Sequence, residues 1–187
     1  YSHERVSSTE ELIDMCGVLH EKGGILKMHL RSEGMELLAA VNEAVRIARE
    51  AEIPVQISHL KAIGKKTWPS MKRVFDLIAN ARSAGVDIAF DVSPYHSTGS
   101  LLYLLLPAWA RHGGFSELFK RIDTPTDRKK ILLELKSFTL HYDKILVISA
   151  PMTNIVGLTI AEIAARGGME PEEAMVETIR VSEGRAE

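Results

Sequence analysis

Three short apolar runs recur at almost constant spacing in the first half of the chain, and each ends in polar residues. The runs are residues 25–30, 55–60 and 86–92. They end on or near His29, His59 and Asp91, which follow one another at intervals of 30 and 32 residues. This interval is the length of a βα unit, and parallel strands buried on both faces are apolar until their last residues. The pattern predicts an α/β fold with these three residues at one shared edge of a parallel sheet.

The segments around these runs have the apolar stripe of amphipathic helices. The first begins with a capping-box pattern, Ser8 followed by Glu11, and ends at Gly23-Gly24. We expect further helices over residues 34–50 and 68–84. Their predicted inward-facing residues are Leu37, Leu38, Val41, Val45 and Ala48 in the former, and Met71, Val74, Phe75 and Ile78 in the latter.

The repeat becomes irregular beyond about residue 100, so we expect residues 1–100 to hold the central βα units and residues 101–187 a mainly helical insertion or lid with continuing elements. The second part contains one candidate strand, Lys144–Ala150. It also contains four candidate helices. They are a short apolar helix that follows a loop within residues 93–114, residues 124–138, capped by Thr126 or Asp127, residues 159–168, and residues 171–184 with Pro171 in the first turn.

Composition excludes several classes of protein. Of 187 residues, 45% are hydrophobic, which is enough for a core, and the 23 Lys and Arg residues are scattered, so we expect no nucleic-acid or membrane partner. The longest apolar stretch, residues 99–110, is interrupted by Pro107. The single Cys16 fits a buried thiol in a reducing, cytoplasmic compartment. The chain starts without methionine, so we expect it to be part of a longer protein.

His29 and His59 are candidates for metal binding. Neutral imidazole is the commonest side-chain ligand of catalytic zinc, and two histidines at the ends of neighbouring strands can reach one ion. A hydrogen-bonded structural role is about equally consistent with the pair. Because catalytic zinc usually takes three protein ligands and a water, we expect further ligands from elsewhere.

Charged residues follow both histidines. Arg31 and Lys61 stand two residues after His29 and His59, which suits recognition of a substrate carboxylate, although solvated loop charges are the alternative. Asp91 is open to three roles: metal ligand, general base, or partner that orients a histidine. The role of Glu33 is also open.

The segments "GGILKMHLRSE", "IPVQISHLK", "ARSAGVDIAFDVSPYHSTGSLL" and "LPAW" occur in this order and spacing. Together they resemble the central part of the D-aminoacylases, the N-acyl-D-amino-acid deacylases of the amidohydrolase superfamily, over roughly residues 1–130. The resemblance implies a zinc-dependent (β/α)8 TIM-type barrel, of which this chain would hold about strands 5 to 7 together with the helical insertion.

The resemblance also implies roles for single residues. His29 and His59 would be metal ligands from the fifth and sixth strands, and Lys61 would hold the α-carboxylate of the substrate. Carboxylate binding would be assisted by Tyr1, Tyr95 and Ser100.

The chain departs from the family pattern in two respects. Ser93-Pro94-Tyr95 stands where the family usually has Tyr-Pro-Tyr, and residues 97–100 differ from the usual Ala-Gly-Ser-Thr, which leaves the side-chain preference open. The family's first-strand HxH pair, its bridging cysteine and its general-base aspartate have no counterparts in these residues. We therefore expect the base to lie outside this segment.

The leading hypothesis is zinc-dependent deacylation of small N-acyl-D-amino acids by a longer parent enzyme. One alternative is a non-catalytic partial barrel that forms homo-oligomers through exposed sheet edges. Another makes Lys61 the Schiff-base lysine of a barrel lyase, although the histidines at the strand ends would then be unexplained.

Overall fold

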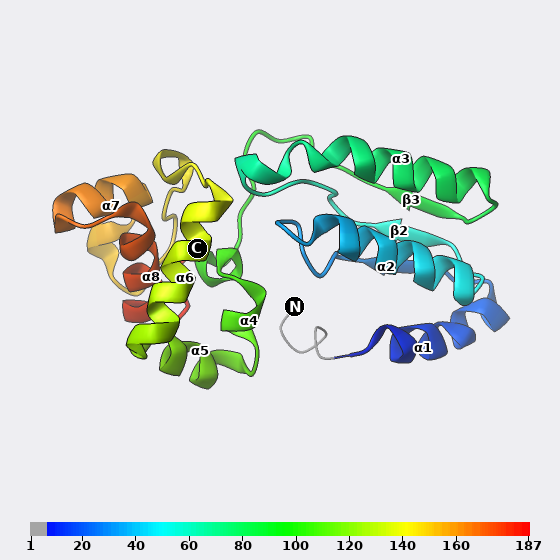
Figure 1. Ribbon diagram of the computed structural model, residues 1–187, viewed down its shortest axis with the longest axis horizontal. Coiled ribbons are helices and arrows are strands. Elements are labelled where there is room, and N and C mark those ends of the chain that lie inside the picture. Colours follow the sequence, from blue (N-terminus) through cyan, green and yellow to red (C-terminus); the bar gives the residue numbers. More distant parts are fainter. Residues whose placement is uncertain (1–6) are drawn as a thin grey trace. The chain divides into compact units, whose positions relative to one another are not determined.

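The computed structural model describes residues 7–187, so Tyr1, which the family resemblance implied in substrate binding, lies outside the described residues. The chain divides into two compact units, one ending at His96 and the other running from Ser97 to Glu187 (Figure 1). Each unit has a hydrophobic core of its own.

The first unit contains a three-stranded parallel sheet with helices between the strands. Its elements in chain order are α1 (Thr9–Lys22), β1 (Leu26–Met28), α2 (Leu37–Glu50), β2 (Val55–Ile57), the 3-10 turn η2 (Lys65–Thr67), α3 (Ser70–Ser83) and β3 (Ile88–Phe90). The strand order is β1-β2-β3, and Leu26, Val55 and Ile88 stand opposite one another. The predicted parallel α/β arrangement is confirmed.

Helices α2 and α3 run along the sheet (Figure 1) and lie on the same face, because crossovers between parallel strands are right-handed. Val55, Ile57 and Ile88 are almost fully buried in the core that these helices complete. Side chains alternate between the two faces of a strand, so Lys27 and Gln56 lie on the opposite face.

The predicted elements of this unit are correct in kind but too long. The strands have three residues each, so His29 and Asp91 follow their strands directly and His59 follows at the second position. The capping box of α1 is present, and Cys16 is buried as expected. The inward orientation predicted for Phe75 is wrong: this residue is 47% exposed and its ring lies at the margin of the core, 5.8 Å from that of Phe90.

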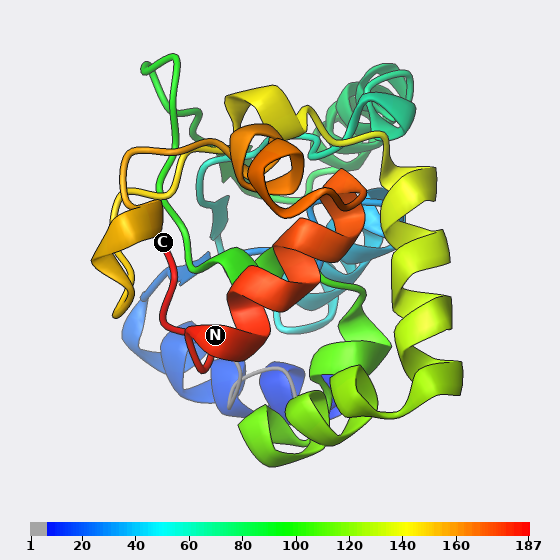
Figure 2. The same cartoon turned by 90° about the vertical axis from the view of Figure 1, so that its left-hand side faces the viewer.

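The second unit is helical. It contains η3 (Leu102–Leu105), α4 (Ala108–Arg111), α5 (Gly114–Asp123), α6 (Pro125–Phe138), η4 (Tyr142–Lys144), η5 (Thr153–Ile155), α7 (Ile160–Gly167) and α8 (Pro171–Val181). Figure 2 shows α8 with α5, α6 and α7 around it. The apolar faces of these helices supply fully buried side chains, among them Leu118, Ile122, Ile131, Leu135, Met175 and Ile179.

Two predictions for this unit are wrong. The strand expected over Lys144–Ala150 does not form, because its backbone groups pair with the loop at Gly157 and Leu158 and with Glu187, and only an isolated bridge links Leu146 to Thr159. Helix α6 is capped at Thr124 and starts with Pro125, so Thr126 and Asp127 lie inside its first turn.

Helix α7 begins with a complete capping box, and this allows a stability prediction. Thr159 Oγ1 accepts a hydrogen bond from the Glu162 N–H at 3.2 Å, and the Glu162 carboxylate accepts one from the Thr159 N–H at 2.7 Å. We expect Thr159→Ala to lower the free energy of unfolding by about 1 kcal/mol, measured by chemical denaturation. Thr126→Ala is the matched control, because Thr126 is an exposed threonine inside the first turn of α6. Equal losses in both variants would contradict the capping role.

Within residues 7–187, no helix is both long enough and apolar enough to cross a membrane.

Candidate metal centre

His29, His59 and Asp91 lie together at the carboxyl edge of the sheet. They follow β1, β2 and β3, and the strands are parallel and in register, so their ends meet at one level. The spacing of 30 and 32 residues in the sequence therefore corresponds to a real cluster.

The two imidazoles converge on each other. Nδ1 of His29 lies 2.5 Å from Nε2 of His59, and the rings are stacked with their centroids 4.6 Å apart. Two nitrogens bound tetrahedrally to one zinc ion are about 3.3 Å apart, because each Zn–N bond is about 2.0 Å long. If the two rings moved apart by less than about 1 Å, both nitrogens could bind one ion. Two imidazole nitrogens are a donor set that fits zinc.

The second nitrogen of His59 faces an ion pair. Its Nδ1 lies 2.9 Å from Glu33 Oε1, and Lys61 Nζ lies 2.7 Å from the same oxygen. Lys61 Nζ is also 3.1 Å from Nδ1, so the tautomer of His59 decides whether Nδ1 donates to Glu33 or accepts from Lys61. A proton on Nδ1, donated to Glu33, leaves the Nε2 lone pair directed toward His29. The side chains of Glu33 and Lys61 are only 17% and 29% exposed.

Asp91 contacts the main chain of His59. Its Oδ1 accepts a hydrogen bond from the His59 N–H at 2.6 Å, and its Oδ2 accepts one from Gln56 Nε2 at 3.2 Å, with Lys27 Nζ at 3.9 Å. The hydrogen bond from the His59 main chain is the main reason that the pKa of Asp91 is below its ordinary value, and Gln56 and Lys27 add to it. Asp91 is therefore a stable anion.

Arg31 is held by groups outside this cluster. Its Nε donates to both carboxylate oxygens of Glu43, at 2.9 and 2.7 Å, and its Nη2 donates to the Ser7 carbonyl at 2.7 Å. These bonds tie the loop after β1 to α2 and to the residue before the cap of α1. Lys61, the cation that follows His59, lies 3.1 Å from Nδ1 of that imidazole.

Two further predicted site residues are described by the structure. Tyr95 lies in the loop of residues 92–100 and is 78% exposed, and Ser100 belongs to the second unit and is exposed. Their roles in carboxylate binding stay predictions.

Sequence reasoning missed Lys27 and Gln56 and left Glu33 without a role. Lys27 and Gln56 are polar residues in the middle of runs that were predicted to be buried strands. These two polar residues could have been recognised from the sequence, because a polar side chain inside a buried strand needs a polar partner.

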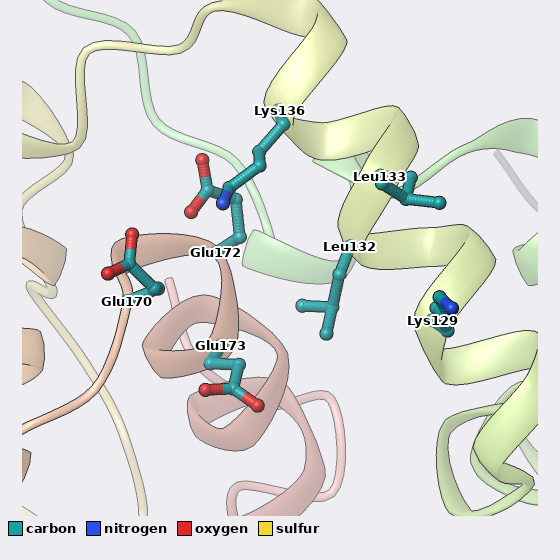
Figure 3. A pocket seen from close by; sticks show the side chains of 7 residues that line it. All are labelled: Lys129, Leu132, Leu133, Lys136, Glu170, Glu172 and Glu173. Carbon is teal, nitrogen blue, oxygen red and sulfur yellow. The ribbon is translucent and has the colours of Figure 1, made fainter.

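A hollow of about 230 Å³ lies between α6 and the start of α8 in the second unit (Figure 3). Its lining residues are Lys129, Leu132, Leu133, Lys136, Glu170, Glu172 and Glu173. None of the predicted site residues lies in it. Within residues 7–187, no three His, Cys, Asp or Glu side chains are grouped so that they could hold a metal ion.

No family model matches the chain. A D-aminoacylase of Alcaligenes xylosoxydans xylosoxydans is 38% identical over 96 residues, which are 51% of this chain and 20% of that protein. A crystal structure of D-aminoacylase, described as defining a subset of amidohydrolases, has a TM-score of 0.62 at 28% identity, covering 91% of this chain and 29% of the other. An N-acyl-D-glutamate deacylase from Bordetella bronchiseptica, crystallised with zinc and a phosphonate inhibitor, has a TM-score of 0.65 at 23% identity and shows a similar fold over 93% of this chain and 30% of the other.

These matches confirm the resemblance that the motifs predicted. The chain spans about a fifth of the length of the curated relatives that it matches.

Proposed function

We propose, from this similarity to the D-aminoacylases and N-acyl-D-amino-acid deacylases, that the chain is part of a zinc-dependent amidohydrolase that removes the acyl group from N-acyl-D-amino acids. The observation that carries the proposal is the convergence of His29 Nδ1 and His59 Nε2 to 2.5 Å at the carboxyl ends of parallel strands. In α/β barrels, active sites lie at this end of the strands.

The proposed fold of the whole enzyme is a (β/α)8 barrel. Strands β1, β2 and β3 would be its fifth to seventh strands, and the helical part from residue 101 onward would be an insertion with continuing barrel elements. Consecutive parallel strands with both crossover helices on one face support this assignment.

In the proposed mechanism, His29 Nδ1 and His59 Nε2 would hold zinc, which polarises the scissile carbonyl and lowers the pKa of a bound water. Glu33 would keep the proton on Nδ1 of His59, so that Nε2 stays available as a ligand. The general base would be an aspartate outside this segment, and the remaining ligands would also come from outside it.

Lys61 would bind the α-carboxylate of the substrate. Its ammonium group has three donors, of which Glu33 takes one, so donors remain for an anion in the mouth of the site. Tyr1, Tyr95 and Ser100 would assist. The same contact disfavours the Schiff-base alternative, because the Glu33 carboxylate, 2.7 Å away, already engages the Lys61 nitrogen that would have to attack a carbonyl.

Metal removal in the protein that carries this chain tests the proposal. We expect zinc by elemental analysis, release of the amino acid from N-acetyl-D-amino acids in preference to the L-enantiomers, loss of turnover after dialysis against a chelator, and recovery on addition of zinc. Full turnover by the zinc-free protein, or equal turnover of both enantiomers, would contradict it.

The alternative of a non-catalytic partial barrel is supported by the edges of the sheet. Within the described residues, β1 and β3 each have one strand neighbour, and exposed edges can pair with another chain. The two proposals differ in a simple measurement: a metal-free oligomer without hydrolase activity, found by light scattering and elemental analysis, would favour the alternative.

A further inference from the structure

We infer that Asp91 is a positioning residue that holds the main chain of His59 in the conformation required for metal binding. The effect on metal binding rests on the proposed function, whereas the conformation of His59 is argued from the contacts of Asp91 alone. It selects one of the three roles that the sequence left open for this residue.

The backbone of His59 departs from the strand. Its φ angle is +43°, in the left-handed region that residues other than glycine rarely adopt. On either side the ladder between β2 and β3 continues: the Asp91 N–H donates to the Ile57 carbonyl at 3.0 Å, and the Leu60 N–H donates to the Asp91 carbonyl at 2.8 Å. The chain therefore makes a local turn at Ser58-His59 between two ladder bonds.

This turn directs the His59 N–H at the Asp91 side chain, and Oδ1 accepts its hydrogen bond at 2.6 Å. By accepting this hydrogen bond, the Asp91 side chain stabilises the left-handed conformation of residue 59.

The carboxylate is itself tied to the sheet. Its Oδ2 accepts from Gln56 Nε2 at 3.2 Å and lies 3.9 Å from Lys27 Nζ. Lys27 and Gln56 stand opposite each other in the register of β1 and β2, so they reach Asp91 from neighbouring strands. Oδ1 of Asp91 already accepts a hydrogen bond from His59, and Oδ2 accepts one from Gln56. A positioning role for Asp91 therefore fits better than a role as metal ligand or general base.

The consequence for the metal site follows from the backbone. If residue 59 relaxed from the left-handed to the extended region, its Cα–Cβ bond would turn and carry Nε2 away from His29 Nδ1, 2.5 Å away in the present arrangement. Asp91 would then influence zinc affinity without touching the ion.

Two variants separate geometry from charge. Asp91→Asn loses the charge but keeps an accepting oxygen at the same place, and Gln56 can turn its amide to present an oxygen to the new NH2 group. Asp91→Glu keeps the charge but displaces the carboxylate by one methylene. The matched control is Asp87→Asn, which changes an exposed aspartate at the other end of the β3 segment.

We expect Asp91→Glu to lower the zinc affinity of the protein about 10- to 100-fold, measured by competition with a chromophoric chelator, because loss of an orienting partner typically has this effect. Asp91→Asn and Asp87→Asn should stay close to wild type. If the role of Asp91 were only to supply negative charge, the Asn variant would lose affinity and the Glu variant would keep it, and that result would overturn the inference.

Hydrogen exchange of the His59 amide gives a second readout that needs no metal. We expect faster exchange in Asp91→Glu than in wild type and Asp91→Asn, all in zinc-free protein with circular dichroism confirming the fold. If the wild-type protein binds no zinc, the proposed function is wrong, but the exchange rates of the His59 amide can still be compared among the variants. Equal exchange rates in all variants would overturn the inference itself.

Discussion

Zinc will be absent from His59→Ala, and hydrolysis of N-acyl-D-amino acids will fall to the level of the zinc-free protein. The variant removes one of the two nitrogens that converge at 2.5 Å, and the described residues offer no third His, Cys, Asp or Glu in a metal-binding group with them. A catalytic zinc site rarely tolerates the loss of one of about three protein ligands. The measurement is elemental analysis after gel filtration, together with turnover of the same sample.

His29→Ala should give the same result, since each histidine supplies one nitrogen to the pair. His96→Ala is the control, because His96 is exposed in the loop of residues 92–100. Its zinc content and turnover should match wild type. Undiminished zinc and turnover in His59→Ala would remove this residue from the ligands.

Lys61→Ala should raise KM for N-acyl-D-amino acids about 10- to 100-fold while zinc is retained, because a hydrogen bond to a charged group contributes about 1.5–3 kcal/mol. Lys61 Nζ lies beside His59, 3.1 Å from Nδ1, on the side away from the nitrogen proposed to bind zinc. The remaining contact of Glu33 with His59 keeps the imidazole oriented. Steady-state kinetics with parallel zinc analysis provides the measurement.

Two controls make the assignment of Lys61 specific. Lys65→Ala changes an exposed lysine of the neighbouring turn and should leave KM unchanged. An N-acyl amine that lacks the carboxylate should be hydrolysed alike by wild type and Lys61→Ala. If KM for the full substrate were the same in both proteins, Lys61 would not be the carboxylate partner.

The order of helices and strands in the first unit could be predicted because its signals are local. Ser8 and Glu11 are three residues apart and form the capping box directly. The strands are shorter than predicted, with three residues each. The left-handed turn at His59, which lies between two ladder bonds, has no signature in a run of apolar residues.

The errors occurred where a segment depends on its neighbours. Lys144–Ala150 has the composition of a strand, but its backbone partners are a loop and Glu187, so a single bridge forms instead of a ladder. Phe75 has the spacing of a core residue, yet it lies at the margin of the helix stripe and is half-exposed beside Phe90.

The sequence by itself determined that His29, His59 and Asp91 end three consecutive parallel strands, because hydrophobic periodicity and repeat length specify the face and order of each element. Only the tertiary structure decided what the three residues do to one another. Asp91 accepts a hydrogen bond from the His59 N–H, and His59 Nδ1 lies 2.9 Å from Glu33 Oε1; both contacts depend on one left-handed residue and on side-chain directions. These arise when separate segments pack together, and no local pattern encodes them.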